Sequence, residues 1–300
     1  MISVCIPVYN YDVLPLAESL HRQCSAVEGE TELVFIDDGS DDEWRGRNAT
    51  LAGYGTYVTL EHNVGRARVR NLFLQHARGE YLLFLDNDSQ VPDGFLSRYA
   101  ALEAERPDVV VGGRVYDRYS DRPECHLRYL YGVEAECRTA EQRRRQPYRS
   151  FMTCNFMVKR EVLRRIPFDE RLTRYGHEDT LFGFRLMQEG VPIVHIDNPV
   201  VNGDLEPNGV FLQKTGEAVQ NLVQLYDMMA GDERFCRSVR LLDAYRTARK
   251  THTTRLVHTA YRLLRRPLES HFIEGNAISV KQFSFYKLGL FIEKKHFINH

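Results

Sequence analysis

The chain has 300 residues, of which 43% are hydrophobic and 27% are charged, so it can bury a core and is not intrinsically disordered. The formal net charge of −1 excludes a general nucleic-acid binder, which needs a positive surplus. The charge is unevenly spread, because residues 240–300 carry 12 Lys and Arg against 4 Asp and Glu, whereas residues 1–239 carry 28 against 37.

The six cysteines form no CxxC pair and no disulfide framework, which favours a reducing compartment. The segment Ile2–Ile6 is too short for the apolar region of a signal peptide, and no apolar run approaches the ~18 residues of a membrane span. We therefore expect a cytoplasmic protein, either free or at the inner face of the cell membrane.

Apolar runs typical of buried strands alternate with stretches of helical spacing over the first two thirds of the chain. The predicted strands are Ile2–Val8, Glu32–Ile36, Thr56–Leu60, Tyr81–Leu85, 109–113, 151–159 and 192–196. The predicted helices between them are 13–24, 67–76, 95–105 and 180–188. Continuous apolar strands separated by helices predict an α/β fold, with a Rossmann-like, mainly parallel sheet covered on both faces.

After Val210 the pattern is almost wholly helical, with expected breaks at 231–232, 266–267 and 275–276. We expect a domain boundary near Gly209, which divides an α/β domain (1–209) from a helical C-terminal extension (210–300).

Polar residues follow three of the predicted strands at their carboxyl ends, where ligands of parallel sheets bind. They are Tyr9-Asn10, Asp37-Asp38 and Asp86-Asn87-Asp88. Two carboxylates spaced like those of Asp86 and Asp88 can converge on one hard divalent cation, although the same triplet also suits an Asx turn. Asp37 or Asp38 can accept a hydrogen bond from a nucleobase or a ribose.

Two later segments carry further charged residues near predicted helix starts. Arg66, Arg68 and Arg70 follow a glycine, and such a position suits either phosphate binding or a solvated basic face. Glu178 and Asp179 precede the helix predicted over 180–188, where they are either functional or capping residues.

Taken together, these segments resemble the family 2 glycosyltransferases of the GT-A fold. The resemblance covers about residues 1–205, in the family's order and spacing. The matching segments are Ser3–Asn10, Phe35–Ser40, Asn63–Asn71, Leu85–Asp88, Cys154–Arg160, Phe168–Glu170 and Tyr175–Asp179.

The resemblance implies a role for each matching residue. The nucleotide would contact Pro7, Tyr9, Asp37, Asp38, Arg70 and Asp86. Asp86 and Asp88 match the DxD motif that holds Mn²⁺ or Mg²⁺, with Asp88 as the main ligand. Asp179 matches the general base of inverting members, and Asn155 and Glu178 lie near the sugar and acceptor pocket.

The implied function is metal-dependent, inverting transfer of a sugar from a nucleotide diphosphate donor, with UDP expected, to a hydroxyl of a saccharide or glycolipid, as in polysaccharide biosynthesis. One alternative is a nucleotidyltransferase, but Pro7–Asn10 offers no Gly-rich phosphate loop. Another is a non-catalytic module of the same fold, which the retained carboxylates of Asp86, Asp88 and Asp179 disfavour.

One departure from the family pattern concerns Asn202, which stands where similar sequences often carry a histidine near the metal. His195 lies close in the sequence but within a predicted strand, so we interpret it as structural. The Arg- and Tyr-rich stretch 116–146 suits either an acceptor site or a solvated surface.

The basic C-terminal region has two interpretations that the sequence leaves open. Arginines beside leucines at 262–268 and aromatic residues beside lysines at 283–295 suit peripheral contact with an anionic membrane. The same residues also suit packing within the chain or against a second subunit in an oligomer.

Overall fold

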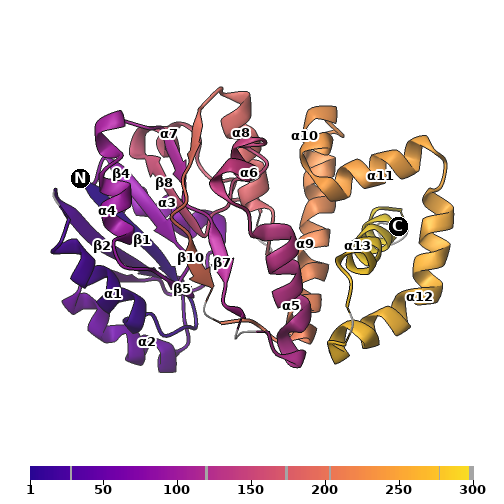
Figure 1. Ribbon diagram of the computed structural model, residues 1–300, viewed down its shortest axis with the longest axis horizontal. Helices are drawn as coiled ribbons and strands as arrows, with labels where there is room; N and C mark the ends of the chain where they lie inside the picture. The colour runs from indigo at the N-terminus through magenta and orange to yellow at the C-terminus, as the bar shows by residue number, and fades with distance from the viewer. Residues whose placement is uncertain (28, 119–120, 173–174, 203, 277, 297–300) are drawn as a thin grey trace. The chain divides into compact units, whose positions relative to one another are not determined.

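The computed structural model describes residues 1–27, 29–118, 121–172, 175–202, 204–276 and 278–296 (Figure 1). The chain forms two units. The first comprises residues 1–115, 137–173 and 178–203, and the second comprises 116–136, 174–177 and 204–300. The helical unit thus takes in two internal segments besides the C-terminal part. The domain boundary near Gly209 remains a prediction.

A seven-stranded sheet lies at the centre of the first unit, in the order β3-β2-β1-β4-β8-β6-β9. The strands are β1 (Ile2–Val8), β2 (Thr31–Asp37), β3 (Thr56–Thr59), β4 (Tyr81–Leu85), β6 (Val109–Val111), β8 (Asn155–Lys159) and β9 (Ile193–His195). Pairing is parallel throughout, except that β8 runs antiparallel to both β4 and β6. This arrangement confirms the predicted α/β fold with a mainly parallel sheet.

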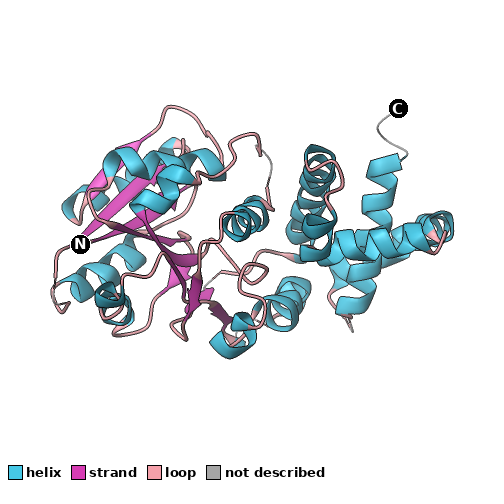
Figure 2. Ribbon diagram, turned by 90° about the horizontal axis from the view of Figure 1, so that it is seen from above, coloured by secondary structure: helices cyan, strands magenta, loops and turns pink. Residues whose placement is uncertain are grey.

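Helices cover both faces of this sheet, so that strands lie between helices in the first unit (Figure 2). One apolar cluster packs α1 (Leu14–Cys24) and α4 (Phe95–Ala100) against the sheet. The other packs α3 (Arg66–His76), α7 (Arg160–Arg165) and α8 (Glu178–Gln188). Because side chains of each strand alternate between the two clusters, the central strands are apolar at nearly every position.

Short elements complete the first unit. They are α2 (Asp42–Asn48), α6 (Ala140–Arg144) and the 3₁₀ turns η1 (Ala49–Gly53) and η2 (Glu103–Glu105). A second sheet, in the order β5-β10-β7, consists of β5 (Ser89–Gln90), β10 (Val200–Asn202) and β7 (Arg114–Tyr116). No strand was expected at these three positions, because each of them contains at most two consecutive apolar residues, too short a run to indicate a buried strand.

The second unit is helical. Its elements are η4 (Pro123–Cys125), α5 (His126–Tyr131), the π-helical turn η5 (Gly132–Glu136), α9 (Asn208–Met228), α10 (Glu233–Ser238), α11 (Arg240–Lys250), α12 (Thr254–Glu274) and α13 (Val280–His296). None of the described helices is long and apolar enough to cross a bilayer.

The break expected at Pro267 is wrong, because α12 continues through this residue. Proline leaves the carbonyl of the residue four positions earlier, Leu263, without a helical donor. The side chain of Leu263 is 75% exposed, so water has access to that side of the helix. Tyr261 and Phe272 on the opposite face are fully buried and hold the helix on both sides of the proline.

A glycine allows α13 to approach α12 closely. A Cβ atom added at Gly289 would overlap the ring of Tyr261 on α12. Gly216 of α9 has no neighbouring atom within 4 Å of an added Cβ. A side chain is therefore sterically excluded at Gly289 but can be accommodated at Gly216.

We predict that Gly289→Ala lowers the free energy of unfolding by about 1–3 kcal/mol, because the added methyl group overpacks the contact with Tyr261. The matched control Gly216→Ala should raise it by about 0.5–1 kcal/mol, since alanine is the better helix former and meets no neighbour. Denaturant unfolding monitored by circular dichroism measures both. A stabilised Gly289→Ala variant would contradict the close α12–α13 packing.

Candidate active site

Arg70 on α3 occupies the centre of the candidate site and is 2% exposed. One of its guanidinium nitrogens donates to Asp86 Oδ1 at 3.0 Å, and another donates to Glu178 Oε1 at 3.4 Å. Asp86 directly follows β4, and Glu178 is the first residue of α8. The arginine therefore joins the end of β4 to the start of α8, which are far apart in the sequence.

The carboxylates of Asp86 and Asp88 experience opposite electrostatic environments. Burial would raise the pKa of Asp86, but the charges of Arg70, Arg66 and Arg114 outweigh burial and lower it. Burial and the neighbouring charge of Asp86 raise the pKa of Asp88. Asp86 is thus held ionised by arginines, whereas Asp88 lacks sufficient positive charge nearby.

Asn202 lies beside Asp88, because β10 pairs with β5 and sets Asn202 opposite Ser89. Its Nδ2 donates to Asp88 Oδ2 at 3.2 Å. Its Oδ1 is buried and has no hydrogen-bond partner among the described residues. Such an orphaned oxygen carries an energetic cost that a cation or a ligand donor would remove.

These oxygens fit a hard divalent cation. Mg²⁺ and similar ions are typically held by one or two protein carboxylates plus substrate phosphates, and a dedicated protein cage is not required. The described residues contain no group of three or more His, Cys, Asp or Glu side chains that could enclose a metal ion. Asp88, Asp86 and the orphaned Oδ1 of Asn202 are the oxygen donors that could hold such an ion.

Asp179 lies in the first turn of α8, next to the Glu178 that Arg70 binds. Burial, reinforced by the charge of Glu178, raises its pKa to about 6, while hydrogen bonds from Thr180 and the charge of Arg70 oppose the rise. The structure therefore brings Asp86, Asp88 and Asp179 to one region, as expected for a site at the carboxyl edge of the sheet.

The residues at the ends of β1 and β2 divide into an exposed and a buried group. Tyr9 is 48% exposed, and Pro7 is half-buried within β1. Asp37 is fully buried and accepts from Ser40 N–H and the Tyr57 hydroxyl. Of these residues, Tyr9 is the one whose ring offers a large surface to a ligand.

Asp38 is 4% exposed, and its two oxygens accept from the backbone N–H groups of Val64 and Gly65 at 2.7 and 3.1 Å. Burial raises the pKa of this carboxyl, although both hydrogen bonds oppose the rise. Asp38 thus ties the end of β2 to the loop before α3. That Asp38 contacts a nucleobase remains a prediction.

Three residues expected to contact the donor or acceptor have intramolecular hydrogen-bond partners. Asn155 is fully buried, accepts from the Tyr99 hydroxyl at 2.6 Å, and donates to the carbonyls of Gly113 and Asn198, both at 2.8 Å. Arg70 and Glu178 bind each other. These contacts fix the side chains of all three residues in place, and their contact with the donor or acceptor remains a prediction.

His195 is structural, as its place in a predicted strand indicated. Its Nδ1 accepts from Arg143 Nε at 3.2 Å, and its Nε2 lies 3.0 Å from the Pro147 carbonyl oxygen. Burial is the main cause that lowers its pKa to about 4, so the ring is neutral. Arg143 also donates to the carbonyls of Gly112 and Ile196 at the ends of β6 and β9. The two interpretations of the stretch 116–146, an acceptor site or a solvated surface, therefore do not describe Arg143, which binds backbone carbonyls and His195.

Two further arginines lie near these carboxylates: Arg114, which the sequence did not indicate, and Arg66, for which it left phosphate binding and a solvated basic face open. Arg114 begins β7, and its charge lowers the pKa of Asp86 and opposes the rise at Asp88. Arg66 is 49% exposed at the start of α3 and lies 3.7 Å from Glu178. Arg114 belongs to the small second sheet, so its proximity to the aspartates has no signal in local sequence patterns.

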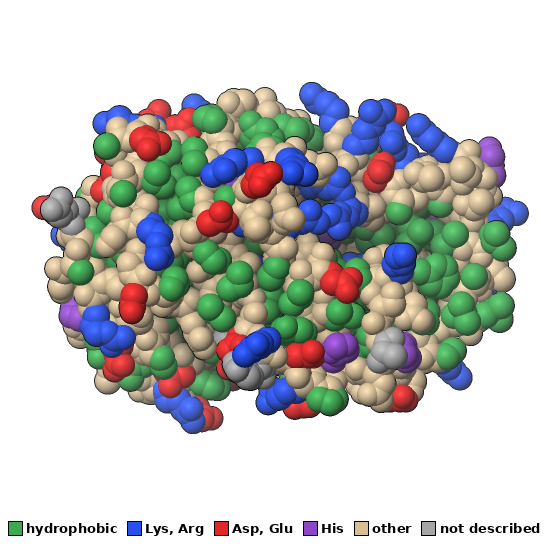
Figure 3. Space-filling view, in the orientation of Figure 1, with side chains coloured by type: hydrophobic (Ala, Val, Ile, Leu, Met, Phe, Trp, Pro, Cys, Tyr) green, Lys and Arg blue, Asp and Glu red, His purple; other side chains and the backbone are tan. Residues whose placement is uncertain are grey.

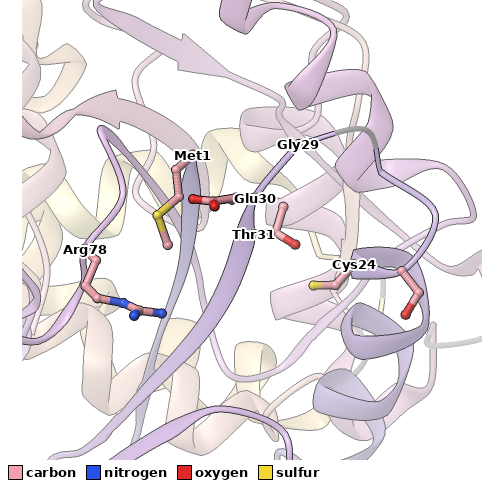
Figure 4. Close-up of a pocket in the computed structure, with 7 residues that line it drawn as sticks. Met1, Cys24, Gly29, Glu30, Thr31 and Arg78 are labelled. Carbon is pink, nitrogen blue, oxygen red and sulfur yellow. The ribbon is translucent and has the colours of Figure 1, made fainter.

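A surface cavity of about 520 Å³ lies near the amino ends of β1 and β2 (Figure 4). Its lining residues are Met1, Cys24, Ser25, Gly29, Glu30, Thr31 and Arg78. It lies at the edge of the sheet opposite to Asp86 and Asp88 and contains none of the candidate site residues.

Solved structures share this architecture. The mannosyltransferase PcManGT from Pyrobaculum calidifontis, in complex with GDP-Man and Mn²⁺, superposes with a TM-score of 0.56 at 16% identity, covering 100% of this chain and 88% of that chain. Staphylococcus aureus TarS 1-349 in complex with UDP-GlcNAc superposes with a TM-score of 0.52 at 18% identity, covering 95% and 89%. These similarities define the class of fold, which is GT-A.

Curated relatives match parts of the chain. YfnE of Bacillus subtilis, an uncharacterized glycosyltransferase, is 25% identical over 63% of this chain and 61% of its own length. The undecaprenyl-phosphate 4-deoxy-4-formamido-L-arabinose transferase of Klebsiella pneumoniae is 34% identical over 36% and 35%. The poly(ribitol-phosphate) β-N-acetylglucosaminyltransferase TarP of Staphylococcus aureus is 31% identical over 37% and 36%. The chain therefore spans about three fifths of the first relative and about a third of the other two.

The family model described as glycosyl transferase family 2 matches residues 3–167, more than half of the chain. The chain belongs to glycosyl transferase family 2.

We predict that Arg70→Met lowers the free energy of unfolding by about 3–5 kcal/mol, because it leaves the carboxylates of Asp86 and Glu178 buried without their partner. The matched control is Arg68→Met on the same helix, where the arginine is 57% exposed and lies 3.9 Å from Glu170. Its loss should cost about 1 kcal/mol or less. Denaturant titration compares the two, and equal losses would contradict the bridging role of Arg70.

Proposed function

We propose that this family member transfers a sugar from a nucleoside diphosphate donor, with UDP as the expected nucleotide, to a hydroxyl of a saccharide or glycolipid acceptor. We further propose inversion at the anomeric carbon. The observation that carries the proposal is the Arg70 bridge, because it brings the aspartates after β4 and the aspartate at the start of α8 to one site.

In this proposal Asp179 takes the proton from the acceptor hydroxyl as that oxygen attacks the anomeric carbon. A pKa of about 6 leaves the carboxylate ionised at neutral pH yet more basic than an ordinary aspartate. A base with a pKa close to the working pH is the most effective in proton transfer. One protein carboxylate is sufficient for a direct displacement, so a second catalytic carboxylate is not needed.

Asp88, Asp86 and Asn202 Oδ1 would hold Mn²⁺ or Mg²⁺. Such an ion supplies positive charge that stabilises a leaving diphosphate. The raised pKa of Asp88 and the orphaned oxygen of Asn202 support this assignment, since a cation would satisfy both groups. PcManGT in complex with Mn²⁺ and GDP-Man gives further support.

The donor nucleotide would lie over the ends of β1 and β2. Tyr9 offers an exposed ring for stacking on the base, and Asp38 retains lone pairs for a base N–H. Arg66, half-exposed at the start of α3, would attract the diphosphate. TarS in complex with UDP-GlcNAc supports a UDP-sugar as donor.

The names of the relatives support the acceptor class. The Klebsiella pneumoniae relative is named for undecaprenyl phosphate, and TarP for poly(ribitol phosphate). We propose that the acceptor here is likewise a saccharide polymer or a lipid-linked saccharide. Membership in family 2 favours sugar transfer over nucleotidyl transfer and over a non-catalytic module. Self-association stays a proposal.

The test of this function is nucleoside diphosphate release from a panel of sugar nucleotides, with and without Mn²⁺, in the presence of saccharide acceptors. Proton NMR of the product reports the anomeric configuration. Release of UDP with an inverted product would support the proposal. Retention of configuration would overturn the assignment of Asp179 as a base, and turnover of no donor would overturn the function.

We predict that Asp179→Asn lowers kcat by about 10²–10⁴-fold, because a base acts in the transition state, while UDP affinity measured by calorimetry stays unchanged. The wild-type rate should fall as pH decreases through about 6, since the protonated carboxyl is no longer a base. The rate of the Asp179→Asn variant should not show this fall at low pH. A loss of UDP binding would instead assign Asp179 to donor binding or structure.

We predict that Mn²⁺ strengthens UDP binding to the wild-type protein and that Asp88→Asn abolishes this effect without changing the melting temperature in EDTA. The physical reason is that an amide is a weaker ligand than a carboxylate for a hard cation. Asp93→Asn, at an exposed carboxylate five positions later, serves as the control and should leave the Mn²⁺ effect intact. An unchanged Mn²⁺ effect in Asp88→Asn would contradict the metal assignment.

A further inference from the structure

Helix α12 exposes an unusual amount of apolar surface. Leu256 and Leu263 are 70% and 75% exposed, the highest values among the large hydrophobic side chains of the described residues. Leu264 and Ile273 on the same helix are 47% and 54% exposed. Figure 3 shows hydrophobic side chains gathered over the surface that includes α12. Large apolar side chains exposed in this number on one helix are typical of an interaction site.

Three arginines accompany these leucines. Arg255, Arg262 and Arg266 are exposed, and no carboxylate of the described residues pairs with them. Arg265 differs, because it binds Glu269 and Glu293 at 3.0 and 3.1 Å. The three exposed arginines therefore contribute positive charge to the surface of α12 that the protein does not neutralise.

The arginines and the leucines form two parallel stripes. Leu256, Leu263 and Pro267 are spaced by seven and four residues, so they lie along one side of the helix. The three arginines precede them by one position each, at 255, 262 and 266, and repeat the same spacing. An apolar stripe flanked by a basic stripe is the pattern of a helix that lies in the interface of an anionic bilayer.

The aromatic residues of α13 behave differently from the leucines of α12. Phe283, Tyr286 and Phe291 are 1%, 4% and 0% exposed and pack within the second unit. For these residues the interpretation as ordinary packing is correct. The apolar surface available to a partner is therefore that of α12 alone among the two C-terminal helices.

We propose that α12 docks on an anionic lipid bilayer, with Leu256, Leu263 and Leu264 at the acyl boundary and Arg255, Arg262 and Arg266 against lipid phosphates. The negative surface potential attracts each arginine, and burial of each leucine away from water lowers the free energy of the bound state. The inference does not depend on which donor the site uses. It would place the enzyme at the surface where a lipid-linked acceptor resides.

Charge disfavours a second copy of this chain as the partner. A twofold dimer joins a patch to the same patch on the other subunit. Such a contact would bring two sets of unpaired arginines together, and like charges at short range repel. An anionic surface complements the same arginines. The bilayer is therefore the partner that satisfies both stripes.

The test is co-sedimentation of the full chain with vesicles at low salt. One set of vesicles is phosphatidylcholine, and the other contains about one third phosphatidylglycerol. We expect at least about tenfold stronger binding to the anionic vesicles, with a loss of binding on added salt. Leu256→Ser/Leu263→Ser and Arg262→Gln/Arg266→Gln should each weaken binding by about tenfold or more.

Two double variants provide matched controls. Val210→Ser/Met228→Ser removes exposed apolar groups from α9, and Arg164→Gln/Arg165→Gln removes exposed charges from α7. Both should bind vesicles as the wild type does. Calorimetry with UDP checks that the α12 variants keep their donor site, so a failed donor proposal and a failed membrane proposal give different results.

Three outcomes would overturn the inference. One is equal recovery of the protein in the supernatant with phosphatidylcholine vesicles and with anionic vesicles. Another is unchanged vesicle binding in both α12 variants. The third is a dimer in sedimentation velocity that Leu256→Ser/Leu263→Ser dissociates, in a protein that does not bind vesicles, because α12 would then be a subunit interface.

Discussion

The guanidinium of Arg70 is buried between carboxylates from two distant parts of the chain, and the candidate site depends on that contact. A buried charge, whether of an arginine or of a carboxylate, is stable only when an opposite charge or hydrogen bonds compensate it. Asp86 and Glu178 compensate the charge of Arg70, and Arg70 compensates theirs, although Arg70 Nε is buried without a hydrogen-bond partner among the described residues. The ion pairs of Arg70 with Asp86 and Glu178 therefore hold together the helix α3, the end of β4 and the start of α8.

This contact also divides the carboxylates of the site into two kinds. Asp86 and Glu178 are bound by arginine, and the pKa of Asp86 is lowered. Asp88 and Asp179 lie one or two residues away and carry the cost of burial, so their pKa values are raised. Neighbouring acids whose environments separate their pKa values are typical of catalytic sites. In the proposed function Asp88 binds the metal, and Asp179 accepts the proton of the acceptor hydroxyl.

The main strands could be predicted because both sheet faces are buried. Ile2–Val8 is apolar except at Ser3, Tyr81–Leu85 is apolar throughout, and the observed strands have the same bounds. The strand β10 could not be predicted, because its two apolar residues, Val200 and Val201, are too short a run to indicate a strand. This strand places Asn202 beside Asp88. The antiparallel direction of β8 is likewise set by pairing with β4 and β6 and has no signal in its own residues.

The sequence alone determined which chemistry is present: acidic residues at the carboxyl ends of buried strands, a basic C-terminal part, and the motifs of family 2. Tertiary structure decided how each residue is used. Asn155 and Glu178 bind other residues of the chain, the aromatic residues of α13 pack inside, and the leucines of α12 face outward. The physical reason is that residue type defines what a side chain can bond, whereas its partner and its exposure depend on segments distant in the sequence.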